Sequence, residues 1–260
     1  MIQPINKTIL FITTLVGIVL CSTLKAQTFQ SGNTKANLVE LYTSEGCSSC
    51  PPADRWLSKL KNHPELWKNL VPIAFHVDYW DWIGWKDDFA KPEFGDRQKR
   101  YKALGRTRSV YTPGFFVNGS EWRDFFNNRE AHPRTKKIPT GSIRALLQDQ
   151  QISFTFTPLD NASQRRDLIA NAALMSFTKS NFVKWGENIG KTLKHDFIVD
   201  ELHSSPLKLN KKKWYTTLQI SNPPIKADNE ASPQALAFWV SDAKTGEVLQ
   251  ATGGWILTRQ

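Results

Sequence analysis

A Cys-Ser-Ser-Cys motif, which begins at Cys47 and ends at Cys50, constrains the fold more than any other feature of the chain. It follows residues 37–43, NLVELYT, which are rich in strand-forming side chains. After the motif, apolar residues recur with the spacing of one helix face, at Ala53, Trp56, Leu57 and Leu60. Pro51 and Pro52 fit the first turn of this helix, where proline is tolerated. We therefore expect both sulfur atoms to lie near a helix N-terminus.

The first 26 residues have the layout of a secretory signal peptide. Lys7 precedes an apolar run over residues 9–20, and Ala26 is the expected cleavage point. This run is shorter than the about 20 apolar residues that a membrane-spanning helix needs, so an uncleaved membrane anchor is the weaker alternative. Lipid modification of Cys21 is disfavoured because Leu20, and not a small residue, precedes it. The sequence thus predicts export to the periplasm or the cell exterior.

The cysteine content favours a chemical role for the motif. The chain has three cysteines, and Cys21 leaves with the signal peptide, so the exported form keeps only the motif pair. Stabilisation by a disulfide grows with the length of the loop that it closes, and a gap of two residues closes almost no loop. The pair is therefore expected to act as a redox centre. The alternative is a non-catalytic secreted binding or assembly module in which the disulfide is static.

The expected chemistry is thiol–disulfide exchange. Only a thiolate attacks a disulfide, and the unpaired N–H groups at a helix N-terminus stabilise a thiolate. Cys47 lies at the loop edge and is expected to attack, whereas Cys50 is tied to the helix and is expected to resolve the mixed disulfide. The substrate is then a protein or a small molecule that carries a thiol or a disulfide.

Metal binding by this motif is disfavoured, and no cofactor is predicted. A zinc site usually needs four ligands with paired spacings, and the chain has no second cysteine pair. His63 and His76 are not at ligand spacing from the motif. A Cu(I) carrier is disfavoured because Met175 is the only methionine after residue 26.

The patterns along the chain change character near residue 151. Before it, strand and helix patterns alternate, at residues 37–43, 51–60, 71–77, 89–104, 110–119 and 142–150. This order predicts an α/β domain over residues 34–150, with a hairpin turn at Asn118 and Gly119. After it, residues 152–156, 214–220 and 236–240 show period-two alternation. Residues 151–260 are therefore predicted to form a mostly antiparallel β domain.

Two segments resemble the thioredoxin superfamily. They are VELYTSEGCSSC, which ends at Cys50, and VYTPGFFVNG, which contains Thr112 and Pro113. The resemblance implies a thioredoxin-like fold for the first domain and a cis peptide bond between Thr112 and Pro113. It also implies that these two residues face the cysteine pair and bind substrate.

The chain more closely resembles the bacterial domain-of-unknown-function family 1223, over nearly the whole exported part. The segments that carry this resemblance are ELYTSEGCSSCPPAD, FHVDYWDWIGWKDDFA, VYTPGFFVNG and GENIGKTLKHDFIV. The family has no settled activity, so the resemblance implies fold more than function. In the last segment, glycine turns account for much of the pattern, and His195 is expected to be structural.

Several polar residues are candidates to support the cysteine pair. Thioredoxins keep a buried acid behind their cysteines, and Glu40 is the candidate here. Its spacing from Cys47 differs by one residue, which changes the face of a strand. Glu45 lies next to the motif. His76, Asp78 and Trp80 lie at the end of the second predicted strand, and ligands tend to bind at strand ends in α/β sheets.

The net charge of +10 favours acidic partners. Export argues against nucleic acid despite this charge. The basic run over residues 97–108, RQKRYKALGRTR, is typical of a solvated helix face, and contact with an anionic membrane through this helix is the alternative. The oligomeric state is not predicted.

Overall fold

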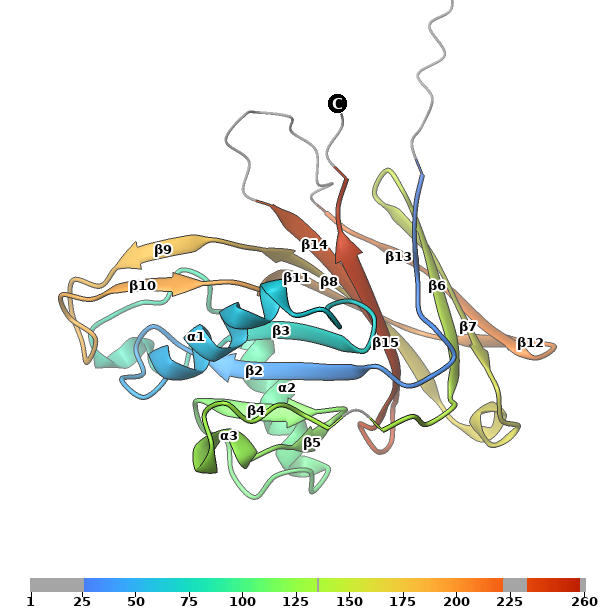
Figure 1. Ribbon diagram of the computed structural model, residues 1–260, viewed down its shortest axis with the longest axis horizontal. Helices are drawn as coiled ribbons and strands as arrows, with labels where there is room; N and C mark the ends of the chain where they lie inside the picture. The colour runs from blue at the N-terminus through green and yellow to red at the C-terminus, as the bar shows by residue number, and fades with distance from the viewer. Residues whose placement is uncertain (1–25, 135, 222–232, 258–260) are drawn as a thin grey trace, which may run out of the picture.

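The computed structural model describes residues 26–134, 136–221 and 233–257, and within them the protein is mostly β-sheet (Figure 1). The predicted signal peptide lies outside the described residues, apart from Ala26. The strands form one sheet of eight strands, one of five and one of two. Two longer helices and three 3₁₀ turns connect them.

The eight-stranded sheet runs through the whole molecule. Its strands, in spatial order, are β15 (Val248–Trp255), β14 (Gln234–Asp242), β8 (Leu168–Ser176), β11 (Ile198–Pro206), β3 (Leu70–His76), β2 (Asn37–Thr43), β4 (Gly114–Val117) and β5 (Ser120–Glu121). β3 pairs in parallel with both β2 and β11, and the other neighbours are antiparallel. Every residue of β2 and β3 is buried, because both faces of this part of the sheet are covered.

The five-stranded antiparallel sheet packs against the β15–β14–β8 end of the large sheet. It contains β1 (Gln27–Gln30), β6 (Gly141–Gln148), β7 (Gln151–Pro158), β13 (Lys213–Gln219) and β12 (Lys208–Asn210). A core of aromatic and aliphatic side chains fills the space between these sheets. The two-stranded sheet contains β9 (Lys179–Phe182), which follows β8, and β10 (Thr192–His195), which precedes β11. It lies on the side of the molecule away from the five-stranded sheet (Figure 1).

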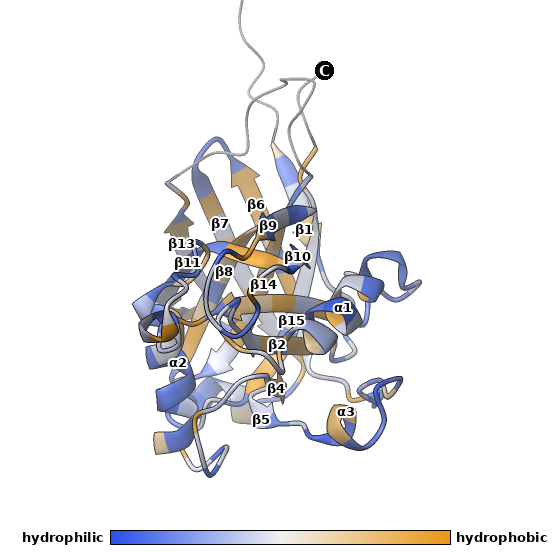
Figure 2. Ribbon diagram, turned by 90° about the vertical axis from the view of Figure 1, so that its left-hand side faces the viewer, coloured by the Kyte–Doolittle hydropathy of each residue, from blue (hydrophilic) through white to orange (hydrophobic). Residues whose placement is uncertain are grey.

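The two longer helices cover opposite faces of the β2–β3 part of the sheet (Figure 2). α1 (Pro51–Lys59) follows β2, and α2 (Pro92–Ala103) follows β3. α3 (Asp124–Asn127) is a single turn after β5. The 3₁₀ turns are Leu60–Asn62, Asp81–Ile83 and Ala162–Arg165. The prediction of helices after residues 50 and 89 is confirmed.

The predicted fold class, an α/β thioredoxin-like domain followed by a mostly antiparallel β domain, is wrong. The protein is mostly β, and β11 pairs directly with β3, with Ile198 opposite Ala74. β8, β14 and β15 then extend the same sheet. The physical reason is that β3 is buried on both faces and still has a free edge, which a strand from later in the chain satisfies.

The expected helix over residues 142–150 is also wrong, because this segment is strand β6. Its buried residues alternate, with Ile143, Ala145 and Leu147 facing the core. Residue 151, where the patterns change, begins β7 immediately after the tight turn from β6. The predicted hairpin turn at Asn118 and Gly119 is confirmed, since Val117 pairs with Ser120.

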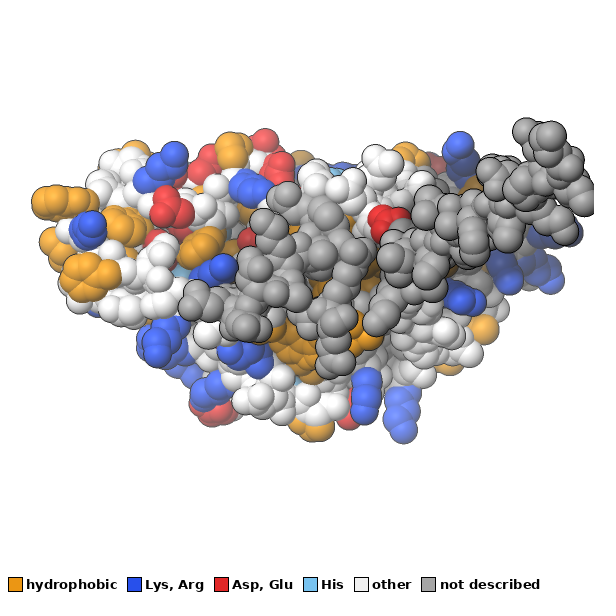
Figure 3. Space-filling model, turned by 90° about the horizontal axis from the view of Figure 1, so that it is seen from above, with side chains coloured by type: hydrophobic (Ala, Val, Ile, Leu, Met, Phe, Trp, Pro, Cys, Tyr) orange, Lys and Arg blue, Asp and Glu red, His pale blue; other side chains and the backbone are white. Residues whose placement is uncertain are grey.

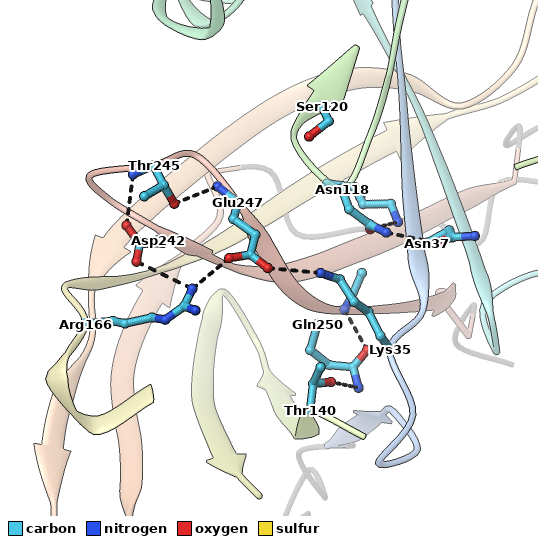
Figure 4. Close-up of polar contacts among 12 residues, drawn as sticks. Lys35, Asn37, Asn118, Ser120, Thr140, Arg166, Asp242, Thr245, Glu247 and Gln250 are labelled. Atoms are coloured by element: carbon cyan, nitrogen blue, oxygen red, sulfur yellow. Dashed lines mark hydrogen bonds and ion pairs between the residues drawn. The ribbon is translucent and has the colours of Figure 1, made fainter. Parts of the chain in front are cut away.

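Polar side chains join the N-terminal segment to the β14–β15 hairpin (Figure 4). The buried Gln250 side chain accepts a hydrogen bond from Ala36 N at 2.9 Å and donates one to Gly141 O at 2.7 Å. Glu247 pairs with Arg166 at 2.8 Å and with Lys35 at 3.5 Å. These contacts satisfy backbone groups where the sheets meet, so this junction is structural.

Candidate functional site

The cysteine pair lies at the carboxyl end of β2, where the chain enters α1. Cys50 occupies the N-cap position of α1, and Pro51 and Pro52 form its first turn, as expected. Both cysteines are free thiols and both are buried, with 2% of Cys47 and none of Cys50 exposed. A Cβ atom at Gly46 would lie 3.0 Å from Cβ of Trp80, so any other residue here would push the two loops apart by a few tenths of an ångström.

The two sulfur atoms differ sharply in acidity. Hydrogen bonds from the Cys50 thiol, the Ser49 hydroxyl and the Thr112 hydroxyl outweigh burial and lower the pKa of Cys47 to about 6. The Ser49 hydroxyl lies 3.3 Å from the Cys47 sulfur. Burial, together with the nearby Cys47, raises the pKa of Cys50 well above its usual value. At neutral pH the pair is therefore a Cys47 thiolate that accepts a hydrogen bond from a Cys50 thiol.

Thr112 and Trp80 meet at this pair. The peptide bond between Thr112 and Pro113 is cis, as predicted. The Thr112 hydroxyl accepts a hydrogen bond from Trp80 Nε1 at 2.7 Å and stabilises the charge on Cys47. Trp80 thus links the loop after β3 to the segment before β4, and Thr112 of that segment reaches both sulfur atoms.

A fully buried carboxylate, Glu45, lies directly before the cysteine loop. Its Oε1 is 3.0 Å from His195 Nε2, at the end of β10. Its Oε2 accepts hydrogen bonds from Trp85 Nε1 at 2.9 Å and from Asn181 Nδ2 at 3.3 Å. Burial of a charge is costly unless the charge is paired and hydrogen-bonded, and these partners meet that condition.

A second buried pair lies beside the first. Asp87 Oδ2 is 2.7 Å from His76 Nδ1 and also accepts a hydrogen bond from the backbone N–H of Glu45 at 2.9 Å. Burial lowers the pKa of His76, but Asp87 outweighs this effect and the net pKa is raised. Burial raises the pKa of Asp87, but His76 outweighs it and the net pKa is lowered. The rings of His76 and His195 are 4.8 Å apart, so both pairs form one cluster.

Asp54 connects this cluster to the cysteines. It lies one turn after Cys50 in α1 and is buried. Burial raises its pKa, while His195 and His76 act in the opposite direction. Its charge in turn contributes to the raised pKa of Cys50. Five buried titratable side chains therefore lie beneath the pair, namely Glu45, Asp54, His76, Asp87 and His195.

The turn between β9 and β10 holds the cysteine loop from outside. Asn188 Nδ2 donates hydrogen bonds to Glu45 O at 2.8 Å and to Cys47 O at 3.0 Å. Glu187 Oε2 accepts a hydrogen bond from Ser48 N at 3.0 Å. These residues belong to the GENIGKTLKH segment, whose two glycines have positive φ and form the turn. The turn thus binds a loop that lies more than 130 residues earlier in the sequence.

The structure brings together some of the predicted site residues and separates others. Glu45 and His76 lie in the buried cluster beside the cysteine loop, and Trp80 binds Thr112, which stabilises the Cys47 thiolate. Pro113 follows Thr112 through the cis bond. Glu40 instead pairs with Arg97 of α2, on the face of the sheet opposite α1. Asp78 lies against Gly95, also in α2. Arg97, the first residue of the basic run, therefore points into the protein.

Sequence reasoning missed Asp54, Asp87, Glu187 and Asn188 and assigned His195 a structural role only. The position of Asp54, four residues after Cys50, was the one local signal, because that spacing places both on one helix face. Within the described parts of the chain, no group of three or more His, Cys, Asp and Glu side chains could hold a metal ion. The same residues include no helix with the length and apolar character needed to cross a membrane.

Comparisons with known proteins give a family and a fold. The profile of a family described as "Protein of unknown function (DUF1223)" matches residues 38–240. Protein AGR_C_4864 from Agrobacterium tumefaciens has a similar structure, with a TM-score of 0.54 and 22% identity over 87% of this chain and 96% of that one. HBP35 of Porphyromonas gingivalis has a TM-score of 0.57 and 13% identity over 86% of this chain and 76% of that one. At these identities the likeness shows the fold alone. No curated protein matches the chain.

Proposed function

The chain belongs to the family of proteins of unknown function DUF1223, and we propose that it is an exported thiol–disulfide oxidoreductase. The observation that supports this proposal is the unequal acidity of the two thiols. Cys47 has a pKa of about 6, whereas that of Cys50 is raised well above its usual value. A thiolate next to a protonated thiol is the arrangement that disulfide exchange requires.

The reaction proceeds in two displacements. The Cys47 thiolate attacks one sulfur of a substrate disulfide, a mixed disulfide forms, and the other substrate sulfur leaves as a thiolate. Cys50 then attacks the Cys47 sulfur, its proton passes to the substrate thiolate released first, and the second substrate sulfur leaves as a thiolate. The substrate gains two electrons and the protein is left with a disulfide between Cys47 and Cys50. The same steps in reverse oxidise a substrate dithiol.

The likeness to the thioredoxin superfamily is, in this proposal, local. It consists of a strand that leads into the cysteine pair, a helix that follows it, and Thr112 beside the sulfur atoms, joined to Pro113 by a cis peptide bond. The sheet around this unit is different, as described above. The proposal therefore concerns the chemistry of the pair.

A second candidate is a non-catalytic binding or assembly module with a structural cysteine pair. The burial of both sulfur atoms favours it, because a buried sulfur is not directly accessible to a substrate. The two functions differ in one measurable property. A redox pair contains one acidic thiol that reacts with alkylating reagents below pH 7, and a structural pair does not.

Single cysteine variants test the proposal. Cys50→Ala should accumulate mixed disulfides with a partner in the exported compartment, because nothing resolves them, and Cys47→Ala should form none. Non-reducing gel electrophoresis after acid quenching detects these species. If Cys50→Ala traps no partner and Cys47 of the wild-type protein titrates near the usual pKa of about 8.5, the structural module is the better account.

A further inference from the structure

Four of the large apolar side chains exposed on the described part of the protein come from two short segments near the cysteine pair. They are Trp82 (80% exposed), Trp185 (64%), Ile189 (59%) and Phe182 (56%). The first is in the 3₁₀ turn after β3, and the other three are in and beside the turn between β9 and β10. We call these four residues the apolar rim. In Figure 3, hydrophobic side chains gather at the end of the molecule that carries this turn.

The two segments of the apolar rim contact each other and the cysteine loop. A Cβ atom at Gly186 would lie 3.3 Å from Cβ of Trp85 and 3.5 Å from Ile83 O, so the two turns touch. Glu187 and Asn188, which lie between Trp185 and Ile189, bind Ser48 N and Cys47 O. The rim therefore borders the loop that carries the attacking sulfur.

We propose that the apolar rim binds an apolar stretch of polypeptide next to the cysteine whose disulfide Cys47 attacks. This inference rests on the proposed function and names its substrate class. Exposed tryptophan and other large apolar side chains in one cluster mark a binding surface, because isolated apolar residues are common on protein surfaces but clusters are not.

The charges around the rim favour a polypeptide over an anionic ligand. The exposed Glu187 carboxylate contacts the cysteine loop, and its hydrogen bonds with Ser48 lower its pKa, so it is ionised at neutral pH. It repels an anionic small disulfide such as oxidised glutathione. The exposed charges in the two turns have both signs, with Lys86, Lys184 and Lys191 against Asp88 and Glu187, so this surface is not the uniformly basic patch that binds an anionic membrane.

Substrate binding at the rim also accounts for the burial of Cys47. Only 2% of this residue is exposed, and the turn that carries Trp185 and Ile189 holds its loop through Asn188. A polypeptide segment that packs on Trp185 and Ile189 contacts the same turn. Its binding energy can therefore shift the turn and uncover the sulfur, whereas a small disulfide has few contacts with which to do so.

Peptides that carry a single cysteine in mixed disulfide with thionitrobenzoate test this inference. One peptide has Leu and Trp around the cysteine, and the other has Ser and Gly at the same positions. We expect the apolar peptide to release thionitrobenzoate about tenfold faster, a ratio equal to about 1.4 kcal/mol. Trp185→Ser and Trp82→Ser should each reduce this ratio by threefold or more. The matched control is Leu159→Ser, since Leu159 is 57% exposed in the bend directly after β7.

Each result decides between named explanations. Equal rates for the two peptides, or a ratio that both tryptophan variants leave unchanged, overturn the peptide-binding surface. The inference is also overturned if the tryptophan variants abolish self-association, measured by light scattering, or binding to phosphatidylglycerol vesicles, measured by co-sedimentation, because the rim then serves one of those contacts instead. If neither peptide nor free dithiobisnitrobenzoate reacts with Cys47, the proposed function itself fails. Near-ultraviolet circular dichroism confirms that the variants are folded.

Discussion

The two ends of the eight-stranded sheet bury different kinds of side chain. Where β8 and β14 pack on the five-stranded sheet, the core is aromatic and aliphatic, with Phe154, Phe156 and Phe238 fully or almost fully buried. Where β2 and β3 end, the buried groups include two carboxylate–histidine pairs and two thiols. Burial of apolar groups stabilises a protein, whereas burial of titratable groups is costly unless all are paired. The difference indicates that the first end provides stability, whereas the second end buries groups whose burial is costly, as the proposed chemistry of the cysteine pair requires.

The strongest test of this division is a cavity at the apolar end. Phe238→Ala removes a ring that contacts Phe29 at 5.2 Å and Phe154 at 6.3 Å between ring centroids. We expect the free energy of unfolding to fall by about 3 to 5 kcal/mol. The alkylation rate of Cys47 in the folded protein should not change. Denaturant unfolding and iodoacetamide labelling measure the two quantities, and a changed labelling rate would show that the two ends are coupled.

The next largest effect is expected from Asp87→Asn, which leaves His76 buried without its charged partner. Breaking a buried ion pair lowers the free energy of unfolding by about 3 to 5 kcal/mol. The asparagine amide retains part of the hydrogen bonding, so we expect a loss near the lower of these figures.

The pH dependence of this effect has a defined sign. The raised pKa of His76 adds stability that is complete below its unfolded value of 6.5 and is lost as pH rises through the folded value. The lowered pKa of Asp87 adds stability above its unfolded value of 3.8 that is lost as pH falls. The free energies of unfolding of wild type and Asp87→Asn should therefore differ most between pH 3.8 and pH 6.5. The free energy of unfolding of both proteins is measured across and beyond this pH range. A difference between them that stays constant with pH would contradict a charged pair of Asp87 and His76.

A smaller effect is expected at the thiolate itself. In wild type, Cys47 alkylation should rise with pH and reach half its maximum near the pKa of about 6, because only the thiolate reacts. Thr112→Val removes one hydrogen bond to that thiolate and should move the midpoint to higher pH by about one unit, equal to about 1.4 kcal/mol. The control is Thr252→Val, a buried threonine in β15. An unshifted midpoint in Thr112→Val would remove Thr112 from the site.

The smallest effect is expected for the turn that holds the cysteine loop. Asn188→Ala removes two hydrogen bonds to the backbone of that loop and should increase the alkylation rate of Cys47 about threefold, which corresponds to about 0.6 kcal/mol in the opening equilibrium. Asn171→Ala, a buried asparagine in β8 that binds Trp239 O and Ser241, is the matched control. A rate that stays the same in Asn188→Ala would show that the turn does not limit access to the sulfur.

Local sequence patterns were sufficient to predict the elements whose structure depends on neighbouring residues in the chain. Strand β2, the cysteine pair and helix α1 follow from a continuous run of about 20 residues in which strand and helix spacing succeed each other. The hairpin at Asn118 and Gly119 follows from two residue types that accept positive φ, here 53° and 80°. The segment over residues 142–150 was misread because Leu146 is apolar and hides the alternation of its neighbours.

Only the tertiary structure decided how distant segments combine. The pairing of β11 with β3 depends on which strand edge is free and which faces are covered, and no pattern within either strand encodes it. Glu45 meets His195, and Asn188 meets Cys47, across 150 and 141 residues. Periodicity shows which face of an element is buried but not which element buries it, because loop closure costs little more for long connections than for short ones. The sequence by itself therefore determined the cysteine motif and its helix, while the folded sheet decided which buried acids, histidines and turn surround it.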